Sequence, residues 1–195
     1  MIPVLFKGIR VGFALTGSFC TFTKVFSEIE KLVSEGADVY PIISESVDKT
    51  DTRYGSAIEW KNRLRVITGK DIISTIAAAE PIGPKRLLDI LVVAPCTGNT
   101  LAKLANAIND TPVTMAVKAH LRNQKPVVIA VSTNDALGNN AKNLGVLLNS
   151  KNVYFVPFEQ DDPDTKQNSL VAKMDLLIPT ILEALQGKQI QPILV

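Results

Sequence analysis

The sequence is poor in the residues that build metal sites and disulfide frameworks. Its 195 residues include only two cysteines, Cys20 and Cys96, and one histidine, His120. Two thiols are too few for a disulfide scaffold, and one imidazole is too few for the usual zinc sites. We therefore expect no bound metal ion, and free cysteines fit a protein of the reducing cytoplasm.

The sequence also lacks a strong excess of charge and any long apolar run. Lysine and arginine total 21 against 19 acidic residues, a net charge of +2, whereas nucleic-acid-binding domains carry a marked basic excess. No stretch approaches the ~20 apolar residues that span a bilayer. Lys7 and Arg10 interrupt the apolar start before it reaches the length of a signal sequence. These absences argue against a nucleic-acid partner, a membrane segment and a targeting signal.

The apolar content is sufficient for one domain. Hydrophobic residues make up 46% of the chain, so residues 1–195 can bury a single core. Segments 89–94 and 126–131 are apolar without alternation, which is typical of parallel strands covered on both faces. Segments of helical period, such as 22–35, alternate with these runs. The pattern predicts an α/β fold with three αβα layers and a doubly wound, mainly parallel sheet of the flavodoxin or Rossmann-like type.

The other expected elements complete that alternation. Further strands are expected at 10–15, 38–43 and 152–156, and helices at 57–64, 72–79, 99–108, 113–121, 136–149 and 170–185, with His120 on a helix surface. Polar loops follow the carboxyl ends of the strands, where ligands bind in such folds. They are 16–18, 44–56, 95–100, 132–138 and 158–164.

The loop at residues 16–18 suits a phosphate group. Gly17 lets the backbone approach a ligand closely, Thr16 and Ser18 supply hydroxyls, and the first N–H groups of the following helix point the same way. The sequence lacks the Gly-x-Gly-x-x-Gly fingerprint of dinucleotide sites and the Lys-Ser/Thr pair of P-loop enzymes. An alternative interpretation is structural, with Ser18 simply capping the helix.

The loop at residues 95–100 follows a fully buried strand and opens a helix. Thr97 and Asn99 can offer polar side chains to a ligand, and Gly98 would let a flat ring approach the backbone. The alternative is again a capped turn, with Asn99 or Thr100 as the cap. Cys96 in this loop, like Cys20 in the first helix, is expected to pack as a small apolar residue.

Together these two loops resemble those of the flavin-containing cysteine decarboxylase superfamily, in which a Gly-x-Thr-Gly-Ser-like loop and a Pro-Ala-x-x-Asn-Thr loop hold FMN. The corresponding segments here read Gly-Phe-Ala-Leu-Thr-Gly-Ser (12–18) and Pro-Cys-Thr-Gly-Asn-Thr (95–100). The resemblance implies an FMN phosphate near Thr16, Gly17 and Ser18, with Ser44 as a further contact. It implies an isoalloxazine ring against the second loop, which consists of Pro95, Cys96, Thr97, Gly98, Asn99 and Thr100.

Two departures weaken the decarboxylase activity that this resemblance would imply. Decarboxylating members carry a histidine before the third strand, where residues 83–87 here place Pro84. They also carry a Pro-Ala-Met-Asn segment after the fourth strand, of which only Asn134 is kept. Proline cannot transfer a proton. A flavin-dependent decarboxylase of a cysteine adduct is therefore an alternative and not the main expectation.

A second resemblance covers nearly the whole chain, and both departures are part of its pattern. On segments 51–55, 79–85, 95–100, 118–123, 133–135 and 156–163, the sequence is similar to the family of dipicolinate synthase B subunits. The resemblance implies oxidation of dihydrodipicolinate to dipicolinate in the cytoplasm of the mother cell of a sporulating bacterium. It further implies an A subunit as partner, NAD(P) bound through that partner and, as in the superfamily, assembly into a homo-oligomer.

Few residues suit the planar dicarboxylate that this second resemblance implies. Such a substrate needs cations, ideally a bidentate arginine. Arg53, in the polar loop after the second strand, and Lys85, just before the third, are the candidates, together with Asn134. Glu80 and Asp135 are open alternatives for acid/base chemistry, so no catalytic residue is assigned. A non-catalytic subunit that only binds flavin or substrate is the remaining alternative.

Overall fold

The continuous apolar runs form the centre of a parallel sheet. In the computed structural model, which describes residues 5–195, β3 (Ile90–Cys96) and β4 (Val127–Thr133) are parallel neighbours, and every residue of β3 is buried. β1 (Arg10–Leu15), β2 (Asp38–Ile43) and β5 (Val153–Phe155) join them in parallel. The order is β2-β1-β3-β4, with β5 beside β4. The expected doubly wound, mainly parallel sheet is confirmed.

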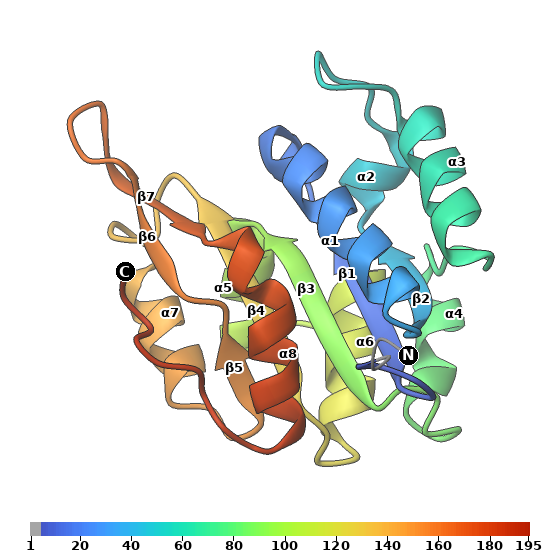
Figure 1. Ribbon diagram of the computed structural model, residues 1–195. Helices are drawn as coiled ribbons and strands as arrows, with labels where there is room; N and C mark the ends of the chain where they lie inside the picture. The colour runs from blue at the N-terminus through green and yellow to red at the C-terminus, as the bar shows by residue number, and fades with distance from the viewer. Residues whose placement is uncertain (1–4) are drawn as a thin grey trace.

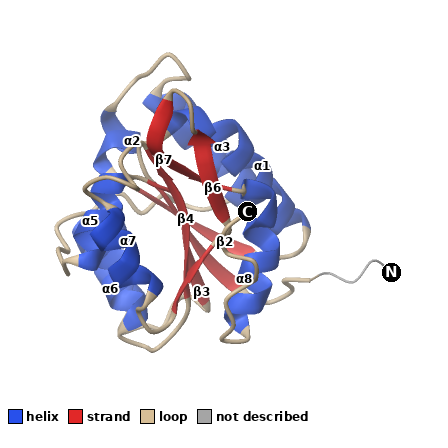
Figure 2. Ribbon diagram, turned by 90° about the vertical axis from the view of Figure 1, so that its left-hand side faces the viewer, coloured by secondary structure: helices blue, strands red, loops and turns tan. Residues whose placement is uncertain are grey.

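Helices cover both faces of this sheet, which confirms the three-layer arrangement (Figures 1 and 2). One buried cluster packs a first group of helices against one face, namely α1 (Phe22–Ser34), α3 (Ala57–Thr68) and α8 (Leu177–Leu185). A second cluster packs the other group against the opposite face, namely α4 (Ile76–Ala79), α5 (Gly98–Ala105), α6 (Pro112–Leu121) and α7 (Ala141–Leu148). Within residues 5–195, no helix combines the length and apolar character needed to cross a membrane.

An antiparallel hairpin replaces part of an expected helix. β6 (Phe158–Asp162) and β7 (Lys166–Ala172) form this hairpin, and α8 begins only at Leu177. The expectation of one helix over 170–185 was wrong because β7 pairs with the end of β4 beyond β5, an interaction that overrides local helical spacing. The hairpin projects from the same end of the molecule as the loop that precedes α3 (Figure 1).

Three further segments differ from expectation. Segment 44–56 contains a short helix, α2 (Glu45–Lys49), before it becomes a loop. Helix α4 is restricted to one turn because Ile73 instead forms a bridge with Ile42 at the sheet edge. Helix α7 starts at Ala141 because the N–H groups of Gly138 and Asn140 both bond to the carbonyl of Asp135 in a preceding turn.

Candidate cofactor site

Thr16 ties the two predicted ligand loops together at the carboxyl edge of the sheet. Its side chain is buried, and its hydroxyl donates a hydrogen bond of 2.7 Å to the carbonyl of Pro95. The same oxygen accepts the backbone N–H of Thr97 at 3.0 Å. The hydroxyl that was expected near a phosphate thus already links the end of β1 to the loop after β3.

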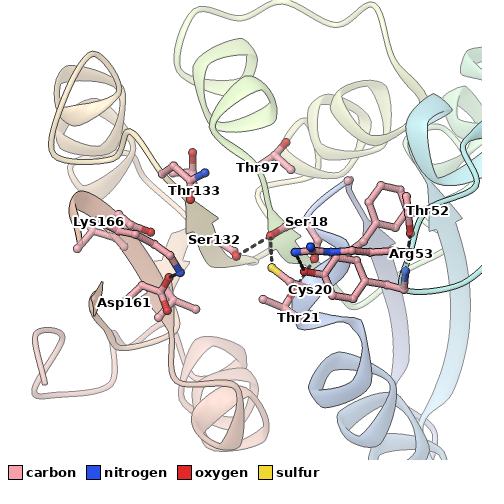
Figure 3. A pocket seen from close by; sticks show the side chains of 17 residues that line it. Ser18, Cys20, Thr21, Thr52, Arg53, Thr97, Ser132, Thr133, Asp161 and Lys166 are labelled. Atoms are coloured by element: carbon pink, nitrogen blue, oxygen red, sulfur yellow. Dashed lines mark hydrogen bonds and ion pairs between the residues drawn. The ribbon is translucent and has the colours of Figure 1, made fainter. Parts of the chain in front are cut away.

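A cleft of about 570 Å³ opens beside these loops (Figure 3). Its walls come from the loop after β1, the loop before α3, the ends of β3 and β4, and the β6–β7 hairpin. Five of the predicted site residues line it, and these are Gly17, Ser18, Arg53, Thr97 and Asn134. The remaining lining residues are Phe19, Cys20, Thr21, Thr52, Tyr54, Ser132, Thr133, Asp161, Lys166, Ser169, Leu170 and Val171.

Hydroxyl groups dominate the floor of the cleft. Ser18 and Ser132 share a hydrogen bond of 2.8 Å between their Oγ atoms, although they lie 114 residues apart. At Gly17, an added Cβ would lie 2.8 Å from Oγ of Ser46, so glycine is what permits this close approach. Ser46 in turn bonds the hydroxyl of Ser44 at 2.9 Å. Ser44 thus lies close to Gly17 through Ser46 but is not part of the cleft lining.

Cations stand on two opposite walls of the cleft (Figure 3). Arg53, before α3, donates from Nη2 to the hydroxyl of Tyr54 at 2.8 Å, and its Cζ lies 4.9 Å from the Tyr54 ring centre. Lys166, on β7, forms an ion pair of 2.6 Å with Asp161 on β6. Both cations are largely exposed to solvent. A cleft with hydroxyls on its floor and cations on its walls favours an anionic ligand.

Most of the second predicted loop lies behind the cleft instead of lining it. Pro95 and Cys96 are buried within β3. Thr100 is buried and accepts a hydrogen bond from the hydroxyl of Thr97 at 3.1 Å. Asn99 is exposed at the start of α5 but outside the lining. Gly98 is buried and outside the lining, and a Cβ there would lie 2.5 Å from Oγ1 of Thr133, so the glycine makes room for the loop after β4.

The other predicted substrate and acid/base residues also divide into those that line the cleft and those that lie outside it. Asn134 is exposed in the cleft. Lys85 lies in the turn before the amino end of β3. This is the opposite end of the strand from the carboxyl edge, so Lys85 does not line the cleft. Glu80 belongs to the 3-10 turn after α4 and is also outside the lining. The Asp135 carboxylate accepts hydrogen bonds from Thr133 and Asn140, which hold the loop after β4.

The single histidine and the two cysteines lie in different surroundings. His120 is buried with Nε2 at 3.1 Å from the Pro126 carbonyl oxygen, so its expected place on a helix surface was wrong. Burial lowers the pKa of His120 to about 4. Cys96 is buried as expected, and burial raises the pKa of its thiol. Cys20, expected to be buried, is exposed in the cleft with Sγ 3.8 Å from Oγ of Ser18.

Ser132 and Asp161 belong to two of the loops expected on the ligand side, 132–138 and 158–164, but the sequence did not single them out, and Lys166 lies outside those loops. The hairpin that carries Asp161 and Lys166 surrounds Pro163-Asp164, a turn signal between two polar segments. That signal could have indicated a hairpin. Its position over the cleft depends on pairing between β7 and β4, which no local pattern reveals.

Comparison with known proteins places the chain among flavoproteins. The family model described as Flavoprotein matches residues 5–183. The dipicolinate synthase B subunit of Bacillus subtilis is 55% identical over 189 residues, which cover 97% of this chain and 94% of the relative. The crystal structure of the dipicolinate synthase B subunit from Bacillus halodurans is 51% identical with a TM-score of 0.90, and the match covers 97% of each chain.

More distant solved structures share the fold. The FMN-dependent cysteine decarboxylase SpaF is 19% identical with a TM-score of 0.66, over 92% of this chain and 98% of its own. DmrB of Burkholderia xenovorans, solved in complex with FMN, is 19% identical with a TM-score of 0.65, over 91% and 96% of the two chains. At these identities the likeness shows the fold alone.

Proposed function

Because the chain belongs to the Flavoprotein family and, within it, to the dipicolinate synthase B subunits, we propose that its cleft binds FMN and that it acts with an A subunit in oxidising dihydrodipicolinate to dipicolinate. The observation that carries this proposal is the cleft at the carboxyl edge. It combines a close-approach glycine, a hydroxyl-rich floor and cations on two walls. NAD(P) is bound by the A subunit in this proposal.

The cleft residues fit the two chemical parts of FMN. Gly17 and Ser18 lie just before the 3-10 turn that leads into α1, whose first N–H groups favour a phosphate. Apolar and aromatic side chains suited to a flat ring also line the cleft, namely Phe19, Tyr54, Leu170 and Val171. Its volume of about 570 Å³ lies within the range of roughly 300–1,000 Å³ that is usual for small-molecule and cofactor sites.

This chain would supply binding and orientation for the reaction. When bound, FMN provides a two-electron redox centre. Gly17 and Ser18 would hold its phosphate, while the Asn134 amide would offer hydrogen bonds to polar atoms of the ring. Arg53 binds a substrate carboxylate through its planar guanidinium group, which can donate two parallel hydrogen bonds.

Proton transfer by histidine is not available in this cleft. The only histidine of the sequence, His120, is buried away from the cleft lining. This placement, like Pro84 in the segment before β3, disfavours the cysteine-decarboxylase alternative. The same observation is consistent with a subunit that binds FMN or substrate while the partner subunit completes the chemistry.

The experiment is reconstitution of dipicolinate formation from purified subunits, followed by the ultraviolet absorbance of the product. We expect the two subunits together to exceed the partner alone. Arg53→Met in this chain should reduce that gain, whereas the matched control Arg65→Met, exposed on α3 and outside the cleft, should keep it. Equal activity of the partner with and without this chain would refute a catalytic or activating role for it.

A further inference from the structure

Arg53 accounts for one carboxylate of a diacid, and the cleft contains a second cation that no sequence motif identified. Among the residues that line the cleft, Arg53 and Lys166 are the two basic side chains. They come from opposite walls, one from the loop before α3 and the other from the β6–β7 hairpin (Figure 3). Lys85, the cation expected to fill this role, lies outside the cleft.

We propose that Lys166 is the second carboxylate-binding residue, so that a planar dicarboxylate is held between Arg53 and Lys166 while Lys166 exchanges its contact with Asp161 for the substrate. This inference rests on the proposed function, which supplies the diacid. It names the residue that distinguishes a diacid from a monoacid.

The Asp161–Lys166 pair is suited to such an exchange. Its Nζ–Oδ2 distance is 2.6 Å, and its side chains are 51% exposed for Lys166 and 38% for Asp161. Exposed ion pairs contribute little net stability, so replacing one carboxylate by another costs little. The hydrogen bond that Lys166 donates to Asp161 also raises the pKa of Lys166, which keeps the ammonium charged.

The charges of the lining explain why a diacid would be preferred. Arg53 and Lys166 contribute two positive charges, and Asp161 offsets one of them. Asp161 lies 2.6 Å from Nζ of Lys166, and in this proposal a substrate carboxylate would replace it there. A monoacid bound to Arg53 leaves the Asp161–Lys166 pair intact and gains nothing from Lys166. A diacid reaches both walls, and specificity comes from the second contact.

Direct binding to the full-length chain tests this assignment by calorimetry. The probes are pyridine-2,6-dicarboxylate and pyridine-2-carboxylate. Lys166→Met should weaken diacid binding roughly two- to five-fold, the value of one exposed ion pair, and leave the monoacid nearly unchanged. Asp161→Asn removes the competing carboxylate and should strengthen diacid binding. Lys166→Arg should keep the diacid preference, and Lys142→Met, exposed on α7, serves as the matched control.

If the proposal is correct, Lys166→Met lowers the affinity for the diacid and Asp161→Asn raises it. If the pair merely stabilises the hairpin, Lys166→Met and Asp161→Asn weaken binding alike, and the proposal is overturned. Equal losses for diacid and monoacid in Lys166→Met overturn it as well. Loss of diacid preference in folded Lys166→Arg, checked by thermal unfolding, is a third contrary result. FMN uptake is measured on the same samples, so a chain that binds FMN without these diacid effects refutes only the assignment of Lys166.

Discussion

The hydroxyl of Thr16 and the carbonyl of Pro95 are joined by a 2.7 Å hydrogen bond across 79 residues of sequence. Because the same hydroxyl accepts the N–H of Thr97, the loops after β1 and β3 form one rigid unit. Gly17 and Ser18 from the first loop and Thr97 from the second thereby line the same cleft. The site is thus built on a buried threonine that the ligand need not touch.

Replacing Thr16 by valine should destabilise the protein. Valine has nearly the same shape but leaves the Pro95 carbonyl and the Thr97 N–H without their buried partner. The expected loss is about 1–3 kcal/mol in the free energy of unfolding, measured by urea denaturation. Thr16→Ser keeps the hydroxyl and should retain most of the stability. A valine variant as stable as the parent would show that this link is unimportant.

Gly98 should tolerate no side chain. A Cβ there would lie 2.5 Å from Oγ1 of Thr133 and 2.6 Å from Oδ1 of Asp135, so Gly98→Ala forces the loop after β4 to move. We expect a loss of about 1–3 kcal/mol, measured by thermal unfolding. The control is Gly145→Ala in α7, where a Cβ meets nothing within 4 Å and alanine should be neutral or stabilising. Similar behaviour of both variants would contradict the packing described for Gly98.

His120 should stay neutral far below the pH at which histidine usually titrates. Burial lowers its pKa to about 4, against about 6.5 in an unfolded chain. The unfolded state therefore binds the proton first, and the stability contributed by neutral His120 is complete above pH ~6.5 and falls as the pH drops towards 4. The sequence has one histidine, so imidazole NMR gives a single titration curve. A midpoint near 6.5 would contradict its burial.

The two cysteines should react at very different rates. Cys20 is exposed in the cleft and Cys96 is buried. A thiol reagent should label one cysteine in the native protein and the second only after unfolding, and Cys20→Ala should abolish the fast phase. A ligand in the cleft should slow the labelling of Cys20. Equal rates for both thiols, or no protection at saturating ligand, would contradict this geometry.

The parallel core could be predicted from sequence because its signal is local. β3 and β4 are uninterrupted apolar runs, and such strands require helices on both faces. The polar loops at the carboxyl edge followed from the same reasoning. The position of the β6–β7 hairpin could not be predicted, since it depends on pairing between β7 and the end of β4.

The site was only partly predictable, because composition does not show where a side chain points. Thr16 and Ser18 are both hydroxyl residues of one loop, yet Thr16 is buried against Pro95 whereas Ser18 lines the cleft. Arg53 and Asn134 do line it, while Lys85 does not. Lys166 was missed because strand pairing brings the hairpin to the cleft, and no local sequence motif reveals that pairing.

The central claim, that this cleft binds a flavin nucleotide, is tested most directly by titrating the purified protein with FMN and recording its visible absorption. The account predicts that the absorption spectrum of the flavin is perturbed and that the flavin stays with the protein on gel filtration. Ser18→Val, which removes the hydroxyl next to Gly17, should retain less flavin. A colourless protein that leaves the spectrum of free FMN unchanged would contradict the account.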